Sequence, residues 1–157
     1  MRTGVRLGVD AGKARVGVAM CDPDGLLATP VVTLGRGGST IADLRGLVIE
    51  HTAVEVVVGL PLSLRGDDTA STVNARELAA ELAAVVEVPV RLVDERLSTV
   101  SAQRALHQSG RSVKASRPVI DQVAAVIILQ NALDFERSAG RPPGVVVERL
   151  TEDADGA

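Results

Sequence analysis

The chain is almost without aromatic side chains: its 157 residues include one phenylalanine and neither tyrosine nor tryptophan. Hydrophobic residues still make up 46% of the chain, so we expect a core of valine, leucine, isoleucine and alanine. Rows of aromatic rings on which single-stranded bases could stack are excluded. This scarcity argues against a nucleic-acid-binding module of the RRM or OB type.

Cysteine and long apolar runs are equally scarce. Cys21 is the only cysteine, which excludes an intramolecular disulfide and a cysteine-based zinc site. The N-terminus has no basic stretch followed by an apolar segment, and no apolar run is long enough to cross a bilayer. The sequence therefore predicts a cytoplasmic protein without a membrane partner. Its length fits one domain of ordinary size.

The net charge of −3 is unevenly distributed along the chain. Residues 148–157 carry four acidic side chains against one basic side chain. Residues 91–117 instead carry six basic side chains against Asp94 and Glu95, a concentration of positive charge that favours contact with phosphates. The basic residues of this segment are Arg91, Arg96, Arg104, Arg111, Lys114 and Arg117.

A β-hairpin is predicted near the N-terminus. Residues 5–9 and 16–20 have the β-branched content of strands, and Gly12 lies in their short connection, where we expect a turn that needs positive φ. Asp10 ends the first strand, and a buried carboxylate there requires a cationic partner. The plain structural alternative is a turn aspartate bonded to backbone N–H groups, and the hairpin alone leaves both open.

The rest of the chain alternates strand and helix patterns. Pro30 indicates that the third strand is an edge strand or carries a bulge, and Pro118 is expected in the first turn of the last helix. The second helix should bury Val73, Leu78, Leu82 and either Val85 or Val86. The predicted elements after the hairpin are strands at 27–34, 54–58 and 90–93, helices at 40–51, 69–86, 98–108 and 118–137, and a basic loop at 111–117.

This order predicts an α/β fold with a mixed five-stranded sheet. Three strands form an antiparallel meander, and two parallel strands lie beyond the first strand because crossover connections are right-handed. Helices flank both faces. We expect a domain at 1–138, followed by a linker and an acidic, disordered tail at 139–157.

Three acidic residues are candidates for a metal site. Asp10 and Glu95 follow strands that end at the same edge of the sheet, and Asp121 lies about one turn inside the last helix. Carboxylates suit Mg²⁺ or Mn²⁺, and two such ions can hydrolyse a phosphodiester. Each acid also has a plain structural explanation as a solvated or helix-stabilising charge. We favour Glu95 over Asp94, because neighbouring strand residues point to opposite faces.

Four motifs resemble the RuvX/YqgF family of Holliday-junction resolvases, which have the RNase H fold. They occur in the order of the family and span residues 5–134. Together they are highly specific, although each is weak alone. The motifs are Gly8-Val9-Asp10-Ala11-Gly12 with Arg15-Val16-Gly17-Val18-Ala19, Val58-Gly59-Leu60-Pro61-Leu62, Asp94-Glu95-Arg96-Leu97-Ser98-Thr99, and Asp121-Gln122-Val123-Ala124-Ala125-Val126-Ile127-Ile128-Leu129-Gln130.

The resemblance implies a metal-dependent nuclease with Asp10, Glu95 and Asp121 as catalytic acids and ligands of two Mg²⁺ or Mn²⁺ ions. It also implies two roles, resolution of four-way DNA junctions in recombination and 5′-end maturation of the 16S ribosomal RNA precursor, and we expect the first. Phosphates would contact Lys13, Arg15, Arg96, Arg111, Lys114 and Arg117. The floor of the site would be formed by Gly12, Gly59, Leu60 and Pro61.

The expected substrate bears on the assembly. A four-way junction has near-twofold symmetry and needs two incisions, so we expect a homodimer that substrate helps to form. Trimming of an RNA end makes no such demand. Two other functions stay open, an ATP-binding lobe of the actin or sugar-kinase type and a non-catalytic nucleic-acid-binding or ribosome-associated factor. The first needs two lobes, and the second has no use for three carboxylates facing phosphate.

Overall fold

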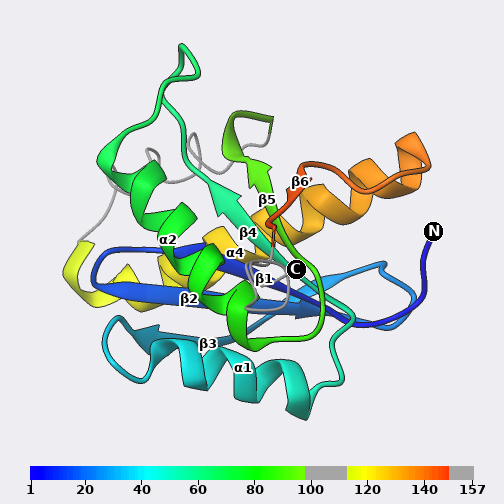
Figure 1. Cartoon of the computed structure of the whole chain (residues 1–157), viewed down its shortest axis with the longest axis horizontal. Helices are drawn as coiled ribbons and strands as arrows, with labels where there is room; N and C mark the ends of the chain where they lie inside the picture. The colour runs from blue at the N-terminus through cyan, green and yellow to red at the C-terminus, as the bar shows by residue number, and fades with distance from the viewer. Residues whose placement is uncertain (98–112, 149–157) are drawn as a thin grey trace, which may run out of the picture.

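The computed structural model describes residues 1–97 and 113–148, and for 97 and 113–120 it describes the backbone alone. In this part of the chain one six-stranded sheet has the order β3-β2-β1-β4-β5-β6 (Figure 1). The strands are β1 Arg6–Ala11, β2 Arg15–Cys21, β3 Ala28–Gly35, β4 Glu55–Leu60, β5 Val90–Asp94 and β6 Val145–Val146. The helices are α1 Thr40–Glu50, α2 Ala70–Val85 and α4 Val113–Ala139, and Glu95–Leu97 form the 3₁₀ turn η1.

The predicted meander is confirmed. β1 pairs antiparallel with β2, and β2 pairs antiparallel with the edge strand β3. Pro30 has both predicted properties: it lies on this edge strand and beside a bulge. Ala19 pairs with Pro30 and Val18 with Val32, so Val31 is the extra residue. Proline has no backbone N–H to donate. On an edge strand this costs no hydrogen bond, because no further strand lies on the outer side.

Gly12 serves a different purpose from the one predicted. It is absent from the residues of positive φ in the described chain. A Cβ at this position would instead lie 2.3 Å from the carbonyl oxygen of Arg15. Glycine is therefore required by the close approach of two backbone segments in the hairpin, and the expectation of a left-handed turn was wrong.

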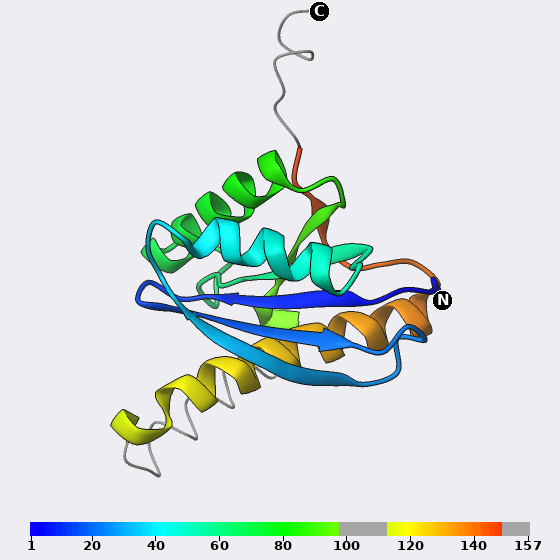
Figure 2. The same cartoon turned by 90° about the horizontal axis from the view of Figure 1, so that it is seen from below.

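The parallel strands follow the predicted crossovers. β4 pairs parallel with β1, and β5 pairs parallel with β4. Helices α1 and α2 cover one face of the sheet and α4 covers the other (Figure 2). Leu78, Leu82 and Val86 are buried on α2 and just after it, whereas Val73 is 47% exposed and was wrongly assigned to the apolar face. Ala75 and Ala79 are buried there instead, because α2 packs closely on the sheet.

Glycine residues on the sheet allow α4 to approach it closely. A Cβ at Gly8 would lie 2.6 Å from the Cβ of Leu129 and 2.9 Å from the carbonyl oxygen of Ala125. At Gly17 it would lie 2.1 Å from the carbonyl oxygen of Asp121. The backbone of α4 therefore rests directly on β1 and β2.

The start of α4 differs from the prediction. The helix begins at Val113, so most of the expected basic loop is helical and Pro118 lies beyond the first turn. The expected helix at 98–108 lies outside the described residues. Val145 and Val146 belong to the predicted linker, yet they pair with Leu92 and Arg91 as the short strand β6. The boundary between domain and tail stays a prediction.

A partly buried ion network joins residues at the starts of β1, β4 and β5 to α4. Glu136 accepts hydrogen bonds from Arg2 at 2.6 Å and from Arg6 at 3.4 Å. Glu55 accepts hydrogen bonds from Arg2 at 3.1 Å and from Arg91 at 3.2 Å. The hydrogen bonds from Arg2 hold the pKa of Glu136 at about 2, below its ordinary 4.5. No local pattern indicated this network, because its members come from four separate segments of the chain.

Candidate active site

Asp10 lies between two glycines of neighbouring strands. It pairs with Gly17 across the antiparallel β1–β2 ladder. The parallel β1–β4 ladder pairs Val9 with Val58, so Gly59 is the next residue along β4. Paired residues point to the same face, and for Gly17 and Gly59 that is the face covered by α4. The carboxylate of Asp10, which is 5% exposed, is thus flanked by two positions without side chains.

Glu95 lies above the second of these glycines. It opens η1 directly after β5 and is 4% exposed. A Cβ at Gly59 would lie 3.1 Å from Oε2 of Glu95 and 2.6 Å from Cδ1 of Ile128. The glycine therefore makes room for the Glu95 carboxylate between β4 and α4.

Asp121 reaches the same region from α4. Its carbonyl oxygen packs on Gly17, the residue paired with Asp10. Its carboxylate accepts a hydrogen bond from Nε of Arg15 at 2.8 Å. The side chains of Arg15 and Asp121 are 33% and 20% exposed, so water screens this ion pair only in part. Arg15, at the start of β2, therefore fixes the position of the Asp121 carboxylate.

The three acids thus share one end of one face, but they do not form a ready metal cluster. In the described ranges no three His, Cys, Asp or Glu residues are grouped so that they could hold a metal ion. Asp10 and Glu95 each already take part in an interaction. Two buried carboxylates with a third on the adjoining helix are nevertheless a hard oxygen donor set, and this chemistry fits a divalent cation.

Asp94, the neighbour of Glu95 in the chain, forms an ion pair with Arg96. Its Oδ2 accepts a hydrogen bond from Nη2 of Arg96 at 2.7 Å, and this contact lowers the pKa of the Asp94 carboxyl. The same guanidinium lies against Gly66, where a Cβ would be 2.9 Å from Nη1. Arg96, predicted to bind phosphate, is therefore paired within the chain.

The other predicted contact residues have mixed outcomes. Lys13 is exposed in the turn between β1 and β2, three residues after Asp10. Arg111 lies outside the described residues. Lys114 and Arg117 occupy the first turns of α4, and their side chains lie outside the description as well.

The predicted floor of the site divides between the two faces of the sheet. Gly59 borders Glu95, as described above. Leu60 is buried in the core that α1 and α2 cover, on the face opposite to Gly59 and the Glu95 carboxylate. Pro61 accepts a hydrogen bond through its carbonyl from the hydroxyl of Thr72 and so fixes the start of α2.

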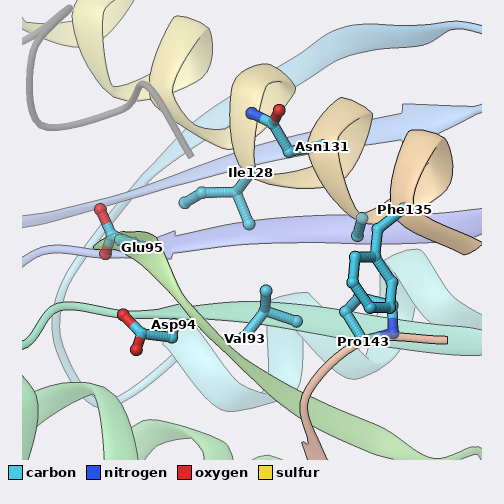
Figure 3. A pocket seen from close by; sticks show the side chains of 8 residues that line it. Val93, Asp94, Glu95, Ile128, Asn131, Phe135 and Pro143 are labelled. Atoms are coloured by element: carbon cyan, nitrogen blue, oxygen red, sulfur yellow. The ribbon is translucent and has the colours of Figure 1, made fainter. Parts of the chain in front are cut away.

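A small apolar pocket adjoins Glu95 on the side of β5 (Figure 3). Sequence reasoning missed it, although Phe135, the one aromatic residue of the chain, was a signal. The guanidinium of Arg141 lies 5.3 Å from the centroid of this ring. The pocket is lined by Val93, Asp94, Glu95, Ile128, Asn131, Ala132, Phe135 and Pro143.

The fold and the comparisons define a class of protein, a nuclease with an RNase H-like fold. The structure resembles that of RuvC from Thermus thermophilus in complex with a Holliday junction, with a TM-score of 0.60 and 18% identity over 90% of this chain and 99% of that one. A second structure of RuvC from Thermus thermophilus gives a TM-score of 0.56 with 16% identity. At this level of identity the likeness concerns the fold.

The chain belongs to the RuvX family, because the family model described as "Holliday junction resolvase" matches residues 4–135. Relatives from Clavibacter michiganensis and Clavibacter sepedonicus are 58% and 57% identical, each over 99% of this chain and 98% of its own length. A relative from Streptomyces coelicolor is 55% identical over 94% of this chain and 90% of its own. All three carry the name "Putative pre-16S rRNA nuclease". No described helix has the length and apolar character needed to cross a membrane.

Proposed function

We propose that this protein is a metal-dependent endonuclease that matures the 5′ end of 16S ribosomal RNA. The observation that carries the nuclease chemistry is the placement of Asp10 between Gly17 and Gly59, with Asp121 over one glycine and Glu95 over the other. The choice of substrate rests on the names of relatives that match over nearly their full length. They favour ribosomal RNA over the junction expected from the sequence.

Asp10, Glu95 and Asp121 would hold two Mg²⁺ or Mn²⁺ ions. Bound there, such ions would activate a water molecule and stabilise the leaving oxygen of a phosphodiester. Burial of Asp10 and Glu95 under α4 keeps water from screening these carboxylates. Their mutual repulsion also supplies a reason for cation uptake at this place.

Basic residues around the acids would orient the RNA backbone. Lys13 lies exposed on the same hairpin as Asp10, and Arg15 lies beside Asp121. Arg96 would contact phosphate in exchange for Asp94. Arg111, Lys114 and Arg117 come from the concentration of basic residues at 91–117 in the sequence, and we propose that they contact phosphate as well.

Asp10→Asn tests the proposed site. The change keeps the shape of the side chain and removes its charge, so Mg²⁺-dependent cleavage of a 16S precursor RNA should fall at least about a hundredfold. Binding of the RNA and the unfolding transition should persist. Asp134→Asn is the matched control, because Asp134 lies exposed near the other end of α4. Full activity of purified Asp10→Asn protein would refute the assignment of Asp10 to the catalytic site, whereas absence of cleavage by the wild-type protein would favour a non-catalytic ribosome-associated role.

Junction resolution is the second candidate, favoured by the description of the family and by the fold of RuvC. Two symmetric incisions would require a substrate-assisted homodimer with two acidic sites. A cleavage panel of precursor RNA, duplex RNA and four-way DNA junction separates the candidates, with light scattering on each complex. Dimers that cut the junction and spare the RNA would replace our first proposal with the second.

A further inference from the structure

We propose that Arg15 competes with the divalent cation for Asp121, and that cation binding transfers the Arg15 guanidinium to a substrate phosphate. This inference rests on the proposed function, since it assumes a cation at Asp10, Glu95 and Asp121. Its basis is the 2.8 Å hydrogen bond between Nε of Arg15 and Oδ2 of Asp121.

Strand geometry places Arg15 and Asp10 at different levels along the sheet. Arg15 and Gly17 are two residues apart on β2 and share the face covered by α4. Gly17 is the partner of Asp10, so Arg15 lies roughly 6.5 Å further along the strand from the Asp10 level. A carboxylate of Asp121 that is turned toward Arg15 is turned along β2, away from the level of Asp10.

The charges explain why the pair forms. Three carboxylates at one end of one face repel one another, and a guanidinium on the third reduces that repulsion when no cation is bound. A divalent cation brings twice the charge to the same acids and removes the need for Arg15. Arginine has five N–H donors in a planar fork, which suit a phosphate as well as a carboxylate. The displaced side chain would therefore remain next to the cation with its donors available to the RNA backbone.

Competition has a measurable consequence without any cleavage. Arg15 holds Oδ2 of Asp121, so a cation that takes this oxygen must break the ion pair, and the pair then weakens cation binding. Partly exposed pairs are weak, and Arg15→Gln should therefore tighten Mn²⁺ binding by about fivefold. Lys13→Gln removes one positive charge from the same hairpin, and Lys13 has no acidic partner in the described part of the chain. That variant should leave Mn²⁺ affinity within about twofold of wild type.

Calorimetric titration of the three proteins with Mn²⁺, in the absence of nucleic acid, measures these affinities. In parallel, ¹⁵N NMR follows the Nε–H signal of Arg15, identified by its loss in Arg15→Gln, while Mg²⁺ is added. Tighter binding in Arg15→Gln alone, with a shift of the Arg15 signal at saturation, supports the transfer.

The opposite outcomes separate the two proposals. Equal Mn²⁺ affinity in wild type and Arg15→Gln, or equal tightening in Lys13→Gln, overturns the competition and leaves the nuclease site standing. An Arg15 signal that is unmoved at saturating Mg²⁺ does the same. Absence of Mn²⁺ and Mg²⁺ binding in all three proteins overturns the metal site itself and the competition with it.

Discussion

Replacing Gly17 by alanine tests whether the packing of α4 on β2 positions the candidate site. The added Cβ would lie 2.1 Å from the carbonyl oxygen of Asp121, and ordinary contact begins at 3.4 Å, so the backbones must separate by about 1.3 Å. The atoms that must move belong to the main chain of a 27-residue helix, which cannot relieve the clash by a change of rotamer. We therefore expect α4 to shift at the level of Asp121.

The cost follows from overpacking. Forcing an extra carbon into a packed interface costs about 1–3 kcal/mol of unfolding free energy. For a domain of this size, about 2 kcal/mol lowers Tm by roughly 4–8 °C. Gly46→Ala is the matched control, because Gly46 lies in α1 and a Cβ added there would have no atom within 4 Å. There alanine should stabilise the helix by about 0.5–1 kcal/mol.

A second variant separates displacement of the site from loss of stability. Gly8→Ala also pushes on α4, at Leu129 and Ala125, but further along the helix from Asp121. Urea unfolding gives the stability of each variant, and cleavage is measured at a temperature where all are folded. Gly17→Ala should lose at least about tenfold more activity than Gly8→Ala of similar stability. If Gly17→Ala is as stable as wild type, or only as impaired in cleavage as Gly8→Ala, then the packing argument fails.

Two further predictions concern charged pairs. Because Arg2 holds the pKa of Glu136 at about 2, the ionised carboxyl stabilises the fold above pH 4.5, and this contribution disappears as pH falls from about 4.5 to about 2. Glu136→Gln should lower the free energy of unfolding by about 3 kcal/mol at pH 7. Urea unfolding of wild type and variant should find a much smaller difference in this free energy at pH 3. An equal difference at both pH values would contradict the prediction. Arg96→Gln should flatten the log–log salt dependence of RNA binding by about one unit, whereas Asp94→Asn removes the carboxylate that competes for Arg96 and should tighten RNA binding without changing the slope. Anisotropy titrations at several salt concentrations measure affinity and slope, and an unchanged slope in Arg96→Gln would exclude Arg96 from the interface.

The sequence by itself determined the order of the elements and most of the sheet. Alternating apolar residues and turn signals are local, so they indicated the hairpin, the meander and the two parallel strands before any contact was known. Pro30 indicated an edge strand or a bulge, because proline has no N–H to donate to a neighbouring strand, and the structure has both. The acids Asp10, Glu95 and Asp121 could be selected because they stand in motifs whose spacing the sequence displays.

Only the tertiary structure decided how these residues meet. Gly17 and Gly59 became the neighbours of Asp10 through strand register, which no single segment encodes. The partner of Asp121 is Arg15, 106 residues away in the chain, and the partners of Glu136 lie at the N-terminus. Val73 has the right helical spacing for the core but lies at the exposed side of α2. Local periodicity fixes which faces are apolar, whereas ion pairs and backbone contacts depend on segments that become neighbours only on folding.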